Sequence, residues 1–292
     1  MTSRLLIDGP SLIYRAFFAV PKTITDPNGQ PVNAVRGFVD MIGQLISDHH
    51  PDELIAVIDA DWRPAFRVAA YPGFKANRPA EPPELTPQLG MIDLVLDAAG
   101  VARAEAAGLE ADDVIATLSH KTSGDDRDSI VTGDRDLLSL VRDPNVRLLF
   151  TVKGVRELKV FDEQEVRSSY GIPPQVYADF ATLRGDPSDE LPGVRGIGPK
   201  IAADLLARFG SLDKLMENLD SVPTQLRSRL RAATDYLDAM KIVVPLVTDA
   251  DVVVTEPHPP EHDKLAVIAK ERNLTGAITR LLTAIDANRP AS

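Results

Sequence analysis

The chain has 292 residues, and its 32 lysines and arginines against 43 aspartates and glutamates give a formal net charge of −11. A hydrophobic content of 44% with 26% charged residues is typical of a folded protein with a core, and it excludes a wholly disordered chain. The absence of cysteine excludes disulfides, thiolate metal sites and a cysteine nucleophile. The length favours one or two domains.

The chain carries no targeting or membrane signal that the sequence reveals. Its N-terminal apolar stretch is too short for a signal peptide, and no run approaches the roughly 18 apolar residues of a membrane span. We therefore expect a soluble, cytoplasmic protein with no membrane partner. An isoelectric point near 5.0 argues against a nucleic-acid partner, because domains that bind nucleic acid are usually basic. That argument holds only if the charges are evenly spread.

The first half of the chain alternates short apolar runs with amphipathic ones. Leu5–Ile7, Leu54–Ile58 and Ile130–Val131 are rich in residues that favour strands, and the segments between them have helical periodicity. Continuous apolar strands alternating with helices predict a parallel sheet covered on both faces. We expect an open α/β domain over residues 1–170.

The second half of the chain is helical in pattern and is interrupted by corners rich in glycine and proline. We expect a smaller helical domain over residues 171–255. A proline-rich connector at 256–261 leads to two further helical stretches, so residues 256–292 are predicted to form a C-terminal helical extension.

Prolines crowd the segment at about 72–87, where five of them fall within sixteen residues, interleaved with Lys75, Asn77 and Arg78. Proline at this density prevents a helix and favours an extended, exposed chain. The segment is either an ordinary surface loop or a mobile flap over a site.

Three aspartates follow predicted strands. Asp8 and Asp59 come directly after apolar runs, and Asp134 comes just after the segment Asp128–Gly133, which contains Ile130 and Val131. A single aspartate at such a position is usually a helix cap or turn residue. Because ligands of open parallel sheets bind beyond the carboxyl ends of the strands, three aspartates at equivalent positions predict a shared site.

Further carboxylates can join this site from helix starts and from a Gly/Pro turn, although each also fits a charged helix cap. Nine carboxylates in one place would repel one another unless cations intervened, and hard oxygen ligands select Mg²⁺ or Mn²⁺. Two such ions about 4 Å apart are a common device for cleaving phosphodiesters. The predicted metal ligands are Asp8, Asp59, Glu110, Asp112, Asp113, Asp134, Asp136, Asp186 and Asp189.

A glycine-rich turn at 191–200 lies between two helical segments. Backbone N–H groups at an unobstructed helix start bind phosphate, and the turn also carries two cations. A tight turn that needs glycine for positive φ is the alternative. No element that reads bases is evident, so we expect contact with the DNA backbone through Gly193, Arg195, Gly196, Gly198 and Lys200.

Taken together, these segments resemble the bacterial 5′ nuclease (flap endonuclease) family, otherwise found as the N-terminal 5′-3′ exonuclease domain of DNA polymerase I. Each motif alone is common, whereas all five in this order are specific. The resemblance covers most of the chain and rests on Ile7–Gly9, Val57–Asp59 with Phe66–Arg67 and Tyr71–Arg78, Glu110–Asp113, Thr132–Leu137, and Gly185–Lys200.

The resemblance implies a Rossmann-like (PIN-like) nuclease core and a helix-three-turn-helix that holds duplex DNA. By position, Asp8, Asp59, Glu110 and Asp112 match ligands of a first metal, and Asp134, Asp136, Asp186 and Asp189 match a second group, with Asp113 nearby. The proline-rich segment matches an arch through which a single-stranded 5′ end passes. Lys75 and Arg78 match cations that approach the scissile phosphate, and Arg67 matches a neighbouring one. Tyr71 is either a stacking platform for an unpaired base or a core aromatic.

Two departures from the family pattern stand out. The usual Asn after the last Asp is Glu190 here, which leads to the hypothesis of an extra metal ligand or altered metal choice. The chain also ends at Ser292 without a polymerase domain, which predicts a free-standing enzyme, although an expressed fragment would look the same.

The sequence thus predicts a metal-dependent 5′-3′ exonuclease and flap endonuclease of replication and repair. We expect two or more Mg²⁺ or Mn²⁺ ions, a monovalent cation at the helix-three-turn-helix, DNA with a 5′ arm as partner, a monomer, and a place at the bacterial nucleoid. The alternatives are a noncatalytic DNA-junction binding protein of the same fold and a small-molecule phosphohydrolase. Residues 61–80 carry a local charge of +3 and residues 191–210 one of +2, so the cations lie where DNA would pass.

Overall fold

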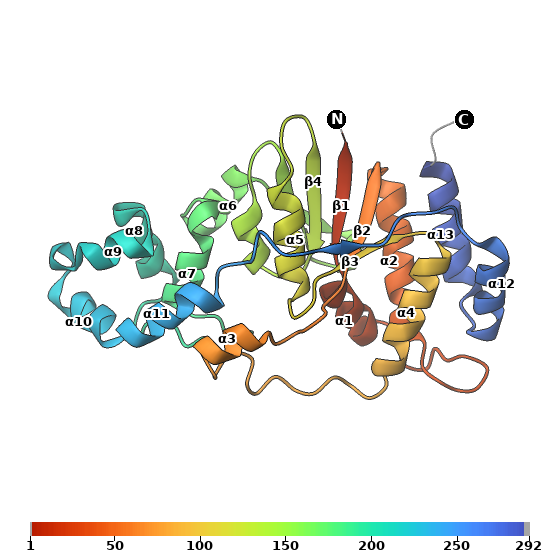
Figure 1. Ribbon diagram of the computed structural model, residues 1–292, viewed down its shortest axis with the longest axis horizontal. Helices are drawn as coiled ribbons and strands as arrows, with labels where there is room; N and C mark the ends of the chain where they lie inside the picture. Colours follow the sequence, from red (N-terminus) through yellow and green to blue (C-terminus); the bar gives the residue numbers. More distant parts are fainter. Residues whose placement is uncertain (1, 289–292) are drawn as a thin grey trace.

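The computed structural model describes residues 2–288 and is built on one twisted seven-stranded sheet (Figure 1). The strand order across the sheet is β6-β5-β4-β1-β2-β3-β7. Strands β1 to β5 are parallel to one another, whereas β6 and β7 pair antiparallel at the two edges. The strands are β1 (Ser3–Asp8), β2 (Glu53–Val57), β3 (Ala102–Glu105), β4 (Arg127–Thr132), β5 (Val146–Thr151), β6 (Leu158–Phe161) and β7 (Val253–Val254).

The central strands are buried on both faces, which explains their unbroken apolar sequences. In β1, Leu5 and Ile7 belong to one hydrophobic cluster, while Leu6 between them belongs to the other. Successive side chains of a strand point to opposite faces, so a run of three apolar residues supplies both layers. The α/β architecture expected from the sequence is confirmed.

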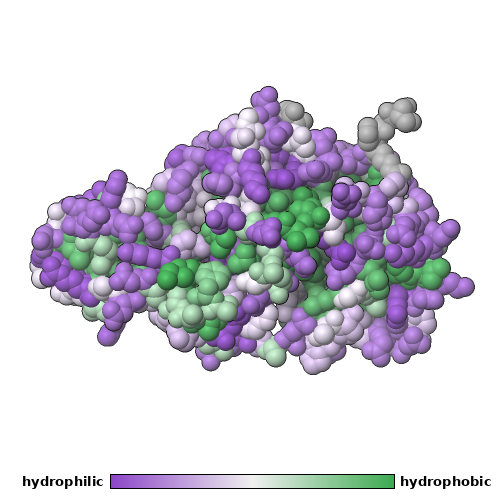
Figure 2. Space-filling model, viewed as in Figure 1, coloured by the Kyte–Doolittle hydropathy of each residue, from purple (hydrophilic) through white to green (hydrophobic). Residues whose placement is uncertain are grey.

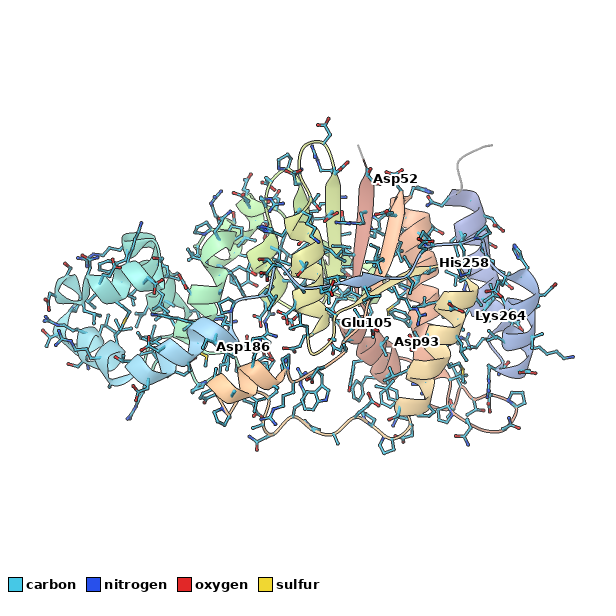
Figure 3. The ribbon with its side chains drawn as sticks, viewed as in Figure 1. Asp52, Asp93, Glu105, Asp186, His258 and Lys264 are labelled. Atoms are coloured by element: carbon cyan, nitrogen blue, oxygen red, sulfur yellow. The ribbon has the colours of Figure 1, made fainter. Side chains whose placement is uncertain are left out.

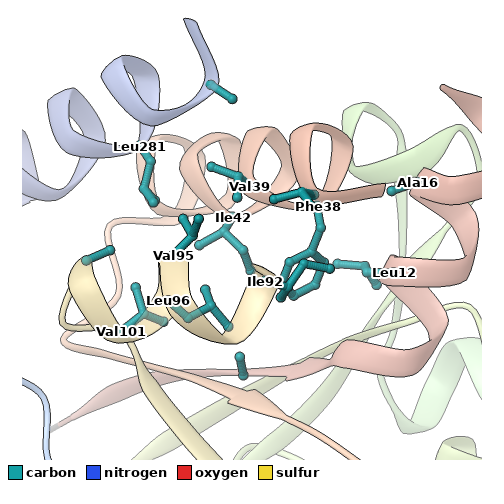
Figure 4. Packing of buried hydrophobic residues seen from close by; sticks show 14 of the residues in the cluster. Leu12, Ala16, Phe38, Val39, Ile42, Ile92, Val95, Leu96, Val101 and Leu281 are labelled. Carbon is teal, nitrogen blue, oxygen red and sulfur yellow. The ribbon is translucent and has the colours of Figure 1, made fainter. Parts of the chain in front are cut away.

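One face of the sheet is covered by helices from both ends of the chain. In this layer, Leu12, Phe38, Ile92 and Leu281 come from four different helices and meet in one core (Figure 4). The covering helices are α1 (Gly9–Ala19), α2 (Asn33–His49), α4 (Thr86–Ala98), α12 (His262–Glu271) and α13 (Thr275–Asn288), with the short helix η2 (Gly154–Arg156) beside α2.

The opposite face leads into the helical region. Its cluster runs without a break from strand residues such as Ile55 and Ile130, through Tyr177, to Leu230 in the helical region. The helices of this layer are α5 (Ala111–His120), η1 (Asp136–Leu140), α6 (Glu163–Tyr170), η3 (Pro174–Val176) and α7 (Tyr177–Arg184).

The remaining helices extend from one end of the sheet, as Figure 1 shows. They are α8 (Pro199–Phe209), α9 (Leu212–Glu217), η4 (Leu219–Ser221), α10 (Thr224–Ala232) and α11 (Thr234–Val243). The chain then returns to the core, where Val253 and Val254 of β7 pair with β3. Figure 2 shows apolar side chains gathered near the middle of the face that β7 crosses.

The predicted C-terminal extension packs on the core rather than standing apart from it. Helix α13 lies along α2, and Lys264 of α12 reaches α4, where its ammonium donates to Asp97 at 3.0 Å (Figure 3). No role could be predicted for these helices, because their partners lie more than 160 positions earlier in the chain. None of the helices within residues 2–288 is long and apolar enough to cross a membrane.

The proline-rich segment is only partly the exposed chain that its composition predicts. It follows α3 (Ala65–Ala70), and its first residues form turns in which Phe74 and Lys75 are buried. Residues 76–80 are exposed, and the chain after them leads to the start of α4. Phe74 is buried because it packs with Leu191 and Met240 of the helical region.

Candidate active site

The carboxyl ends of the parallel strands place three aspartates at one edge of the sheet. Asp8 is the last residue of β1, and its carboxylate caps α1 by accepting from the Ser11 N–H at 3.1 Å. The second oxygen of Asp8 accepts a hydrogen bond from the Thr132 hydroxyl at the end of β4. Asp59 and Asp134 lie two residues beyond β2 and β4, as the strand pattern predicts.

The start of α5 supplies the next group. Glu110 is the N-cap residue, and Asp113 is its capping-box partner. Asp59 accepts a hydrogen bond from the Ala111 N–H at 2.7 Å, which joins the β2 edge to this helix start. Carboxylates in a first helical turn are favoured by the helix dipole, so the sequence can hold several of them here.

A short loop brings the last two carboxylates from the helical region. Backbone hydrogen bonds between Asp186 and Leu191 close the loop, and Arg184 forms an ion pair with Asp186 at 3.2 Å. Figure 3 shows Asp186 at the junction of the core and the helical region. One narrow cavity at this junction is lined by carboxylates from three elements, namely Glu110, Asp112, Asp136, Asp186 and Asp189.

The electrostatics of the cluster are those of an acidic site enclosed by protein. Burial raises the pKa of Asp8 and that of Glu110 to about 7. Burial followed by repulsion from Asp134 raises the pKa of Asp112 and that of Asp136 well above the ordinary value. Protonation or cations must therefore offset the charge, because like charges in a poorly solvated site disfavour ionisation.

The side chains present fit divalent cations. The donors are carboxylate oxygens, which Mg²⁺ and Mn²⁺ prefer, and Oδ1 of Asp136 is buried without a hydrogen-bond partner. Within residues 2–288, no three His, Asp or Glu side chains surround a single point as a ready coordination shell. Ion pairs with Lys75, Arg67 and Arg184 draw several of the carboxylates instead.

Lys75 lies inside the acidic cavity. Its ammonium donates to Glu110 and lies 3.6 Å from Asp189, and its side chain is 7% exposed. Burial lowers its pKa, but attraction to Asp189 and Glu110 outweighs that and leaves the pKa above the usual value. Arg78 lies further out, with its guanidinium 4.0 Å from Asp189 and its side chain 42% exposed. Both cations of the proline-rich segment therefore face the carboxylates.

Arg67 is buried and bound on every side. Its guanidinium donates to both oxygens of Asp113 at 2.6 and 2.8 Å, to Glu110 at 2.8 Å, and to the Val243 carbonyl at 2.9 Å. Asp113 also accepts from the Val247 N–H at 2.9 Å. The structure thus places this pair where the chain after α11 joins the core, and Arg67 has no free N–H directed at the cavity's mouth.

Tyr71 and Glu190 have partners within the protein. The ring of Tyr71 packs edge-on against Tyr236, with 6.1 Å between the ring centres, and it lies against the hydrophobic cluster that contains Phe74. These contacts are those of a core aromatic residue. The Glu190 carboxylate accepts from the Asn77 N–H at 2.8 Å and from its side-chain amide at 3.1 Å. Glu190 therefore connects the proline-rich segment to the 186–191 loop. Its role as an extra metal ligand stays a prediction.

The glycine-rich turn leads into α8. Gly193 and Gly196 have positive φ, and a Cβ on Gly193 would lie 2.4 Å from the backbone nitrogen of Gly185. Val194 and Ile197 are buried and hold the turn in place. No side chain caps α8, and no atom lies within 4 Å of where a Cβ on Gly198 would stand. Glycine is therefore required here for its positive φ, and it also leaves the start of α8 open to a phosphate. Arg195 and Lys200 are exposed beside the turn.

A hollow beside the acidic cavity was not expected from the sequence. It is lined along the outer face of α1 by Ser11, Tyr14, Arg15, Phe18 and Ala19. Burial, followed by repulsion from Glu81, raises the pKa of Tyr14. The helical periodicity of 11–18 predicted a buried face, and nothing in it marks the aromatic residues of the outer face as exposed.

Comparison with known proteins assigns the chain to a family. Residues 3–171 match the N-terminal resolvase-like domain of 5′-3′ exonucleases, and residues 172–262 match their C-terminal SAM fold. The chain belongs to the 5′-3′ exonuclease family. The predicted membership and the predicted fold are both confirmed.

The proteins to which this chain is similar cover it to different extents. A 5′-3′ exonuclease of Streptomyces coelicolor is 46% identical over 97% of this chain and 100% of its own length. DNA polymerase I of Mycobacterium bovis is 41% identical over 86% of this chain, but only over 28% of the polymerase. The bacteriophage T5 D15 flap endonuclease, in complex with DNA and metal ions, has the same fold, with a TM-score of 0.68, 18% identity, and coverage of 97% of this chain and 99% of its own.

Proposed function

We propose that this 5′-3′ exonuclease hydrolyses phosphodiesters of DNA that carries a 5′ single-stranded arm, with two divalent cations, Mg²⁺ or Mn²⁺, at the carboxylate cluster. The observation that carries the proposal is the cavity in which Asp112 and Asp136 from the core meet Asp186 and Asp189 from the helical region. Such a site forms only when both regions are in place, so duplex bound at the helical region is held beside the acidic site.

Different residues of the protein have different roles in the proposed reaction. When bound, the cations supply Lewis acid stabilisation of the phosphate's charge. The eight carboxylates other than Asp113 hold them, whereas Asp113 fixes Arg67. Lys75 and Arg78 face the same space and supply positive charge where the phosphate's negative charge develops. The exposed turn at 193–200 holds the duplex by its backbone.

The relatives' names and solved structures support the substrate. The Streptomyces relative is named a 5′-3′ exonuclease, and the T5 flap endonuclease is solved with DNA and metal ions. The acidic site lies within one chain, which supports a monomer, and the place at the bacterial nucleoid follows only from the proposed DNA substrate. A monovalent cation at the glycine-rich turn and Glu190 as a further ligand remain proposals, and the second is tested by metal titration of Glu190→Asn.

The replacement Asp134→Ala tests the proposal. Asp134 repels Asp8, Asp112 and Asp136, and it makes one local hydrogen bond to the Asp136 N–H at 2.9 Å. We expect the variant to fold, with an unchanged circular dichroism spectrum, and to lose cleavage of a 5′-flap substrate in Mg²⁺. Full cleavage by the folded variant would overturn the proposal. Retained binding without any cleavage by the wild-type chain would instead favour the noncatalytic junction-binding alternative.

A further inference from the structure

Trp62 is the single tryptophan of the chain, and its side chain stands at the surface with 45% of its area exposed. It belongs to the loop that joins β2 to α3, next to the carboxylate edge of the sheet. Tryptophan is enriched at binding surfaces, because it offers a partner a large apolar ring together with a polar N–H.

The loop around Trp62 is held rigidly on both sides. The Asp61 N–H donates to the Leu109 carbonyl at 3.0 Å, and the Asp61 carboxylate accepts from the Arg63 N–H at 2.9 Å. The Arg63 guanidinium donates to the Phe74 carbonyl at 2.7 Å and to the Pro72 carbonyl at 3.0 Å. The backbone that carries the indole is thus held in place, which lowers the entropy cost of ordering the loop when a partner binds.

Arg78 connects Trp62 to the acidic site. Its guanidinium carbon lies 5.9 Å from the centre of the indole ring, and a guanidinium nitrogen lies 4.0 Å from Asp189. The arrangement outward from the carboxylates is therefore a cation followed by an exposed aromatic ring. A nucleotide presents the matching pair of groups, a phosphate for the cation and a flat base for the ring.

We propose that Trp62 is a stacking platform for an unpaired base of the 5′ single-stranded arm, next to the phosphate that Arg78 contacts. The inference rests on the proposed function and adds a binding subsite for single-stranded DNA. The internal base pairs of duplex DNA do not fit the subsite, because their bases are stacked on both faces and cannot offer one to the indole. Stacking is tolerant of sequence, so the subsite takes any base.

The single tryptophan makes a direct test possible, because all indole emission comes from Trp62. The wild-type chain in EDTA is titrated with a 5′-flap oligonucleotide, and binding is followed in the same sample by the anisotropy of a dye on the duplex end. We expect the bound flap to quench the emission. A flap with tetrahydrofuran abasic sites in its arm should bind with much less quenching, and a blunt duplex, which has no unpaired arm, should also quench less than the flap.

Substitution gives an independent measurement. Stacking on an aromatic side chain contributes enough that Trp62→Ala should weaken binding of the flap about tenfold. Its affinity for blunt duplex should not change, and Trp62→Phe should restore affinity for the flap, because a phenyl ring still stacks. Val160→Ala is the matched control, since Val160 is 47% exposed on the edge strand β6 and should affect neither ligand.

The outcomes separate the inference from the function on which it rests. Binding and cleavage of the flap with no quenching, or with equal quenching by the abasic flap, would overturn the stacking role and leave the nuclease function intact. Equal losses of flap and duplex affinity in Trp62→Ala would also overturn it. No binding and no cleavage by the wild-type chain would overturn both.

Discussion

Glu110 and Asp113, one turn apart at the start of α5, meet the same cation in different ways. Arg67 binds both oxygens of Asp113, which also accepts the Val247 N–H, so this carboxylate is fully used by the protein. Glu110 is shared between Arg67 and Lys75 at the edge of the cavity. Within this acidic motif, Asp113 therefore has a structural role, whereas Glu110 faces the site.

Arg67→Ala should destabilise the protein as well as affect the site. The replacement leaves the fully buried Asp113 without its cation, and breaking a buried ion pair in this way costs about 3–5 kcal/mol. Urea denaturation should show this loss in the free energy of unfolding. The double variant Arg67→Ala/Asp113→Ala should lose less than the sum of the two single losses. A stable Arg67→Ala variant with reduced activity would instead favour the role at the scissile phosphate.

The raised pKa values of Asp8 and Glu110 predict how stability depends on pH and metal. With both pKa values about 7, the folded metal-free protein binds more protons than the unfolded chain between about pH 4 and pH 7. The contribution of these groups to the free energy of unfolding therefore falls as pH rises through that interval. Mg²⁺ binds the ionised carboxylates, so it should raise the melting temperature more at about pH 8 than at about pH 5.5.

Calorimetry in EDTA and in Mg²⁺ at the two pH values checks this. Asp8→Asn is the control, because it removes one titrating group, and it should reduce both the pH dependence and the Mg²⁺ effect. An equal rise with Mg²⁺ at both pH values would contradict the account.

Among the elements, the C-terminal helices show how distant segments complete the core. A Cβ on Gly43 of α2 would lie 3.3 Å from the Leu281 backbone of α13, so the two helices approach closely. Leu281 is fully buried between them. Arg280 of α13 adds an ion pair with Asp40 of α2 at 2.6 Å, and Arg272 pairs with Asp26 at 3.2 Å.

Leu281→Ala should therefore destabilise the whole core. Truncation of a buried leucine removes hydrophobic contact and leaves a cavity, at a cost of about 2–5 kcal/mol. Val267→Ala is the control, because Val267 on α12 is 54% exposed and should change stability by less than about 0.5 kcal/mol. Both values come from urea denaturation. Similar stabilities for the two variants would show that α13 is not part of the cooperative core.

Across the whole molecule, the charge is separated rather than spread. Without the nine predicted metal ligands the formal charge of −11 becomes −2, so the proposed site would account for most of the net negative charge. The exposed cation Arg78 lies on the proline-rich segment, and the exposed cations Arg195 and Lys200 lie on the glycine-rich turn. An acidic isoelectric point is therefore compatible with DNA binding, because the local field guides the partner.

Much of the fold could be predicted from local sequence pattern. Apolar strands that each end in an aspartate define the edge of the sheet, and Asp8, Asp59 and Asp134 lie there as expected. Partners chosen by tertiary packing could not be predicted. Neither the packing of α13 on α2 nor the hydrogen bonds that Asn77 donates to Glu190 leave a local pattern, since each joins segments more than 100 positions apart.

The central claim is that a metal-dependent site between the core and the helical region cuts DNA at the junction of a 5′ arm and a duplex. Its most direct test is the sizing of products from a 5′-labelled flap and from a 5′-labelled blunt duplex, in Mg²⁺, in Mn²⁺ and in EDTA. The account predicts arm-length oligonucleotides from the flap with either metal, mononucleotides from exonuclease action on the duplex, and no product in EDTA. Cleavage that persists in EDTA, or that ignores the position of the junction, would contradict it.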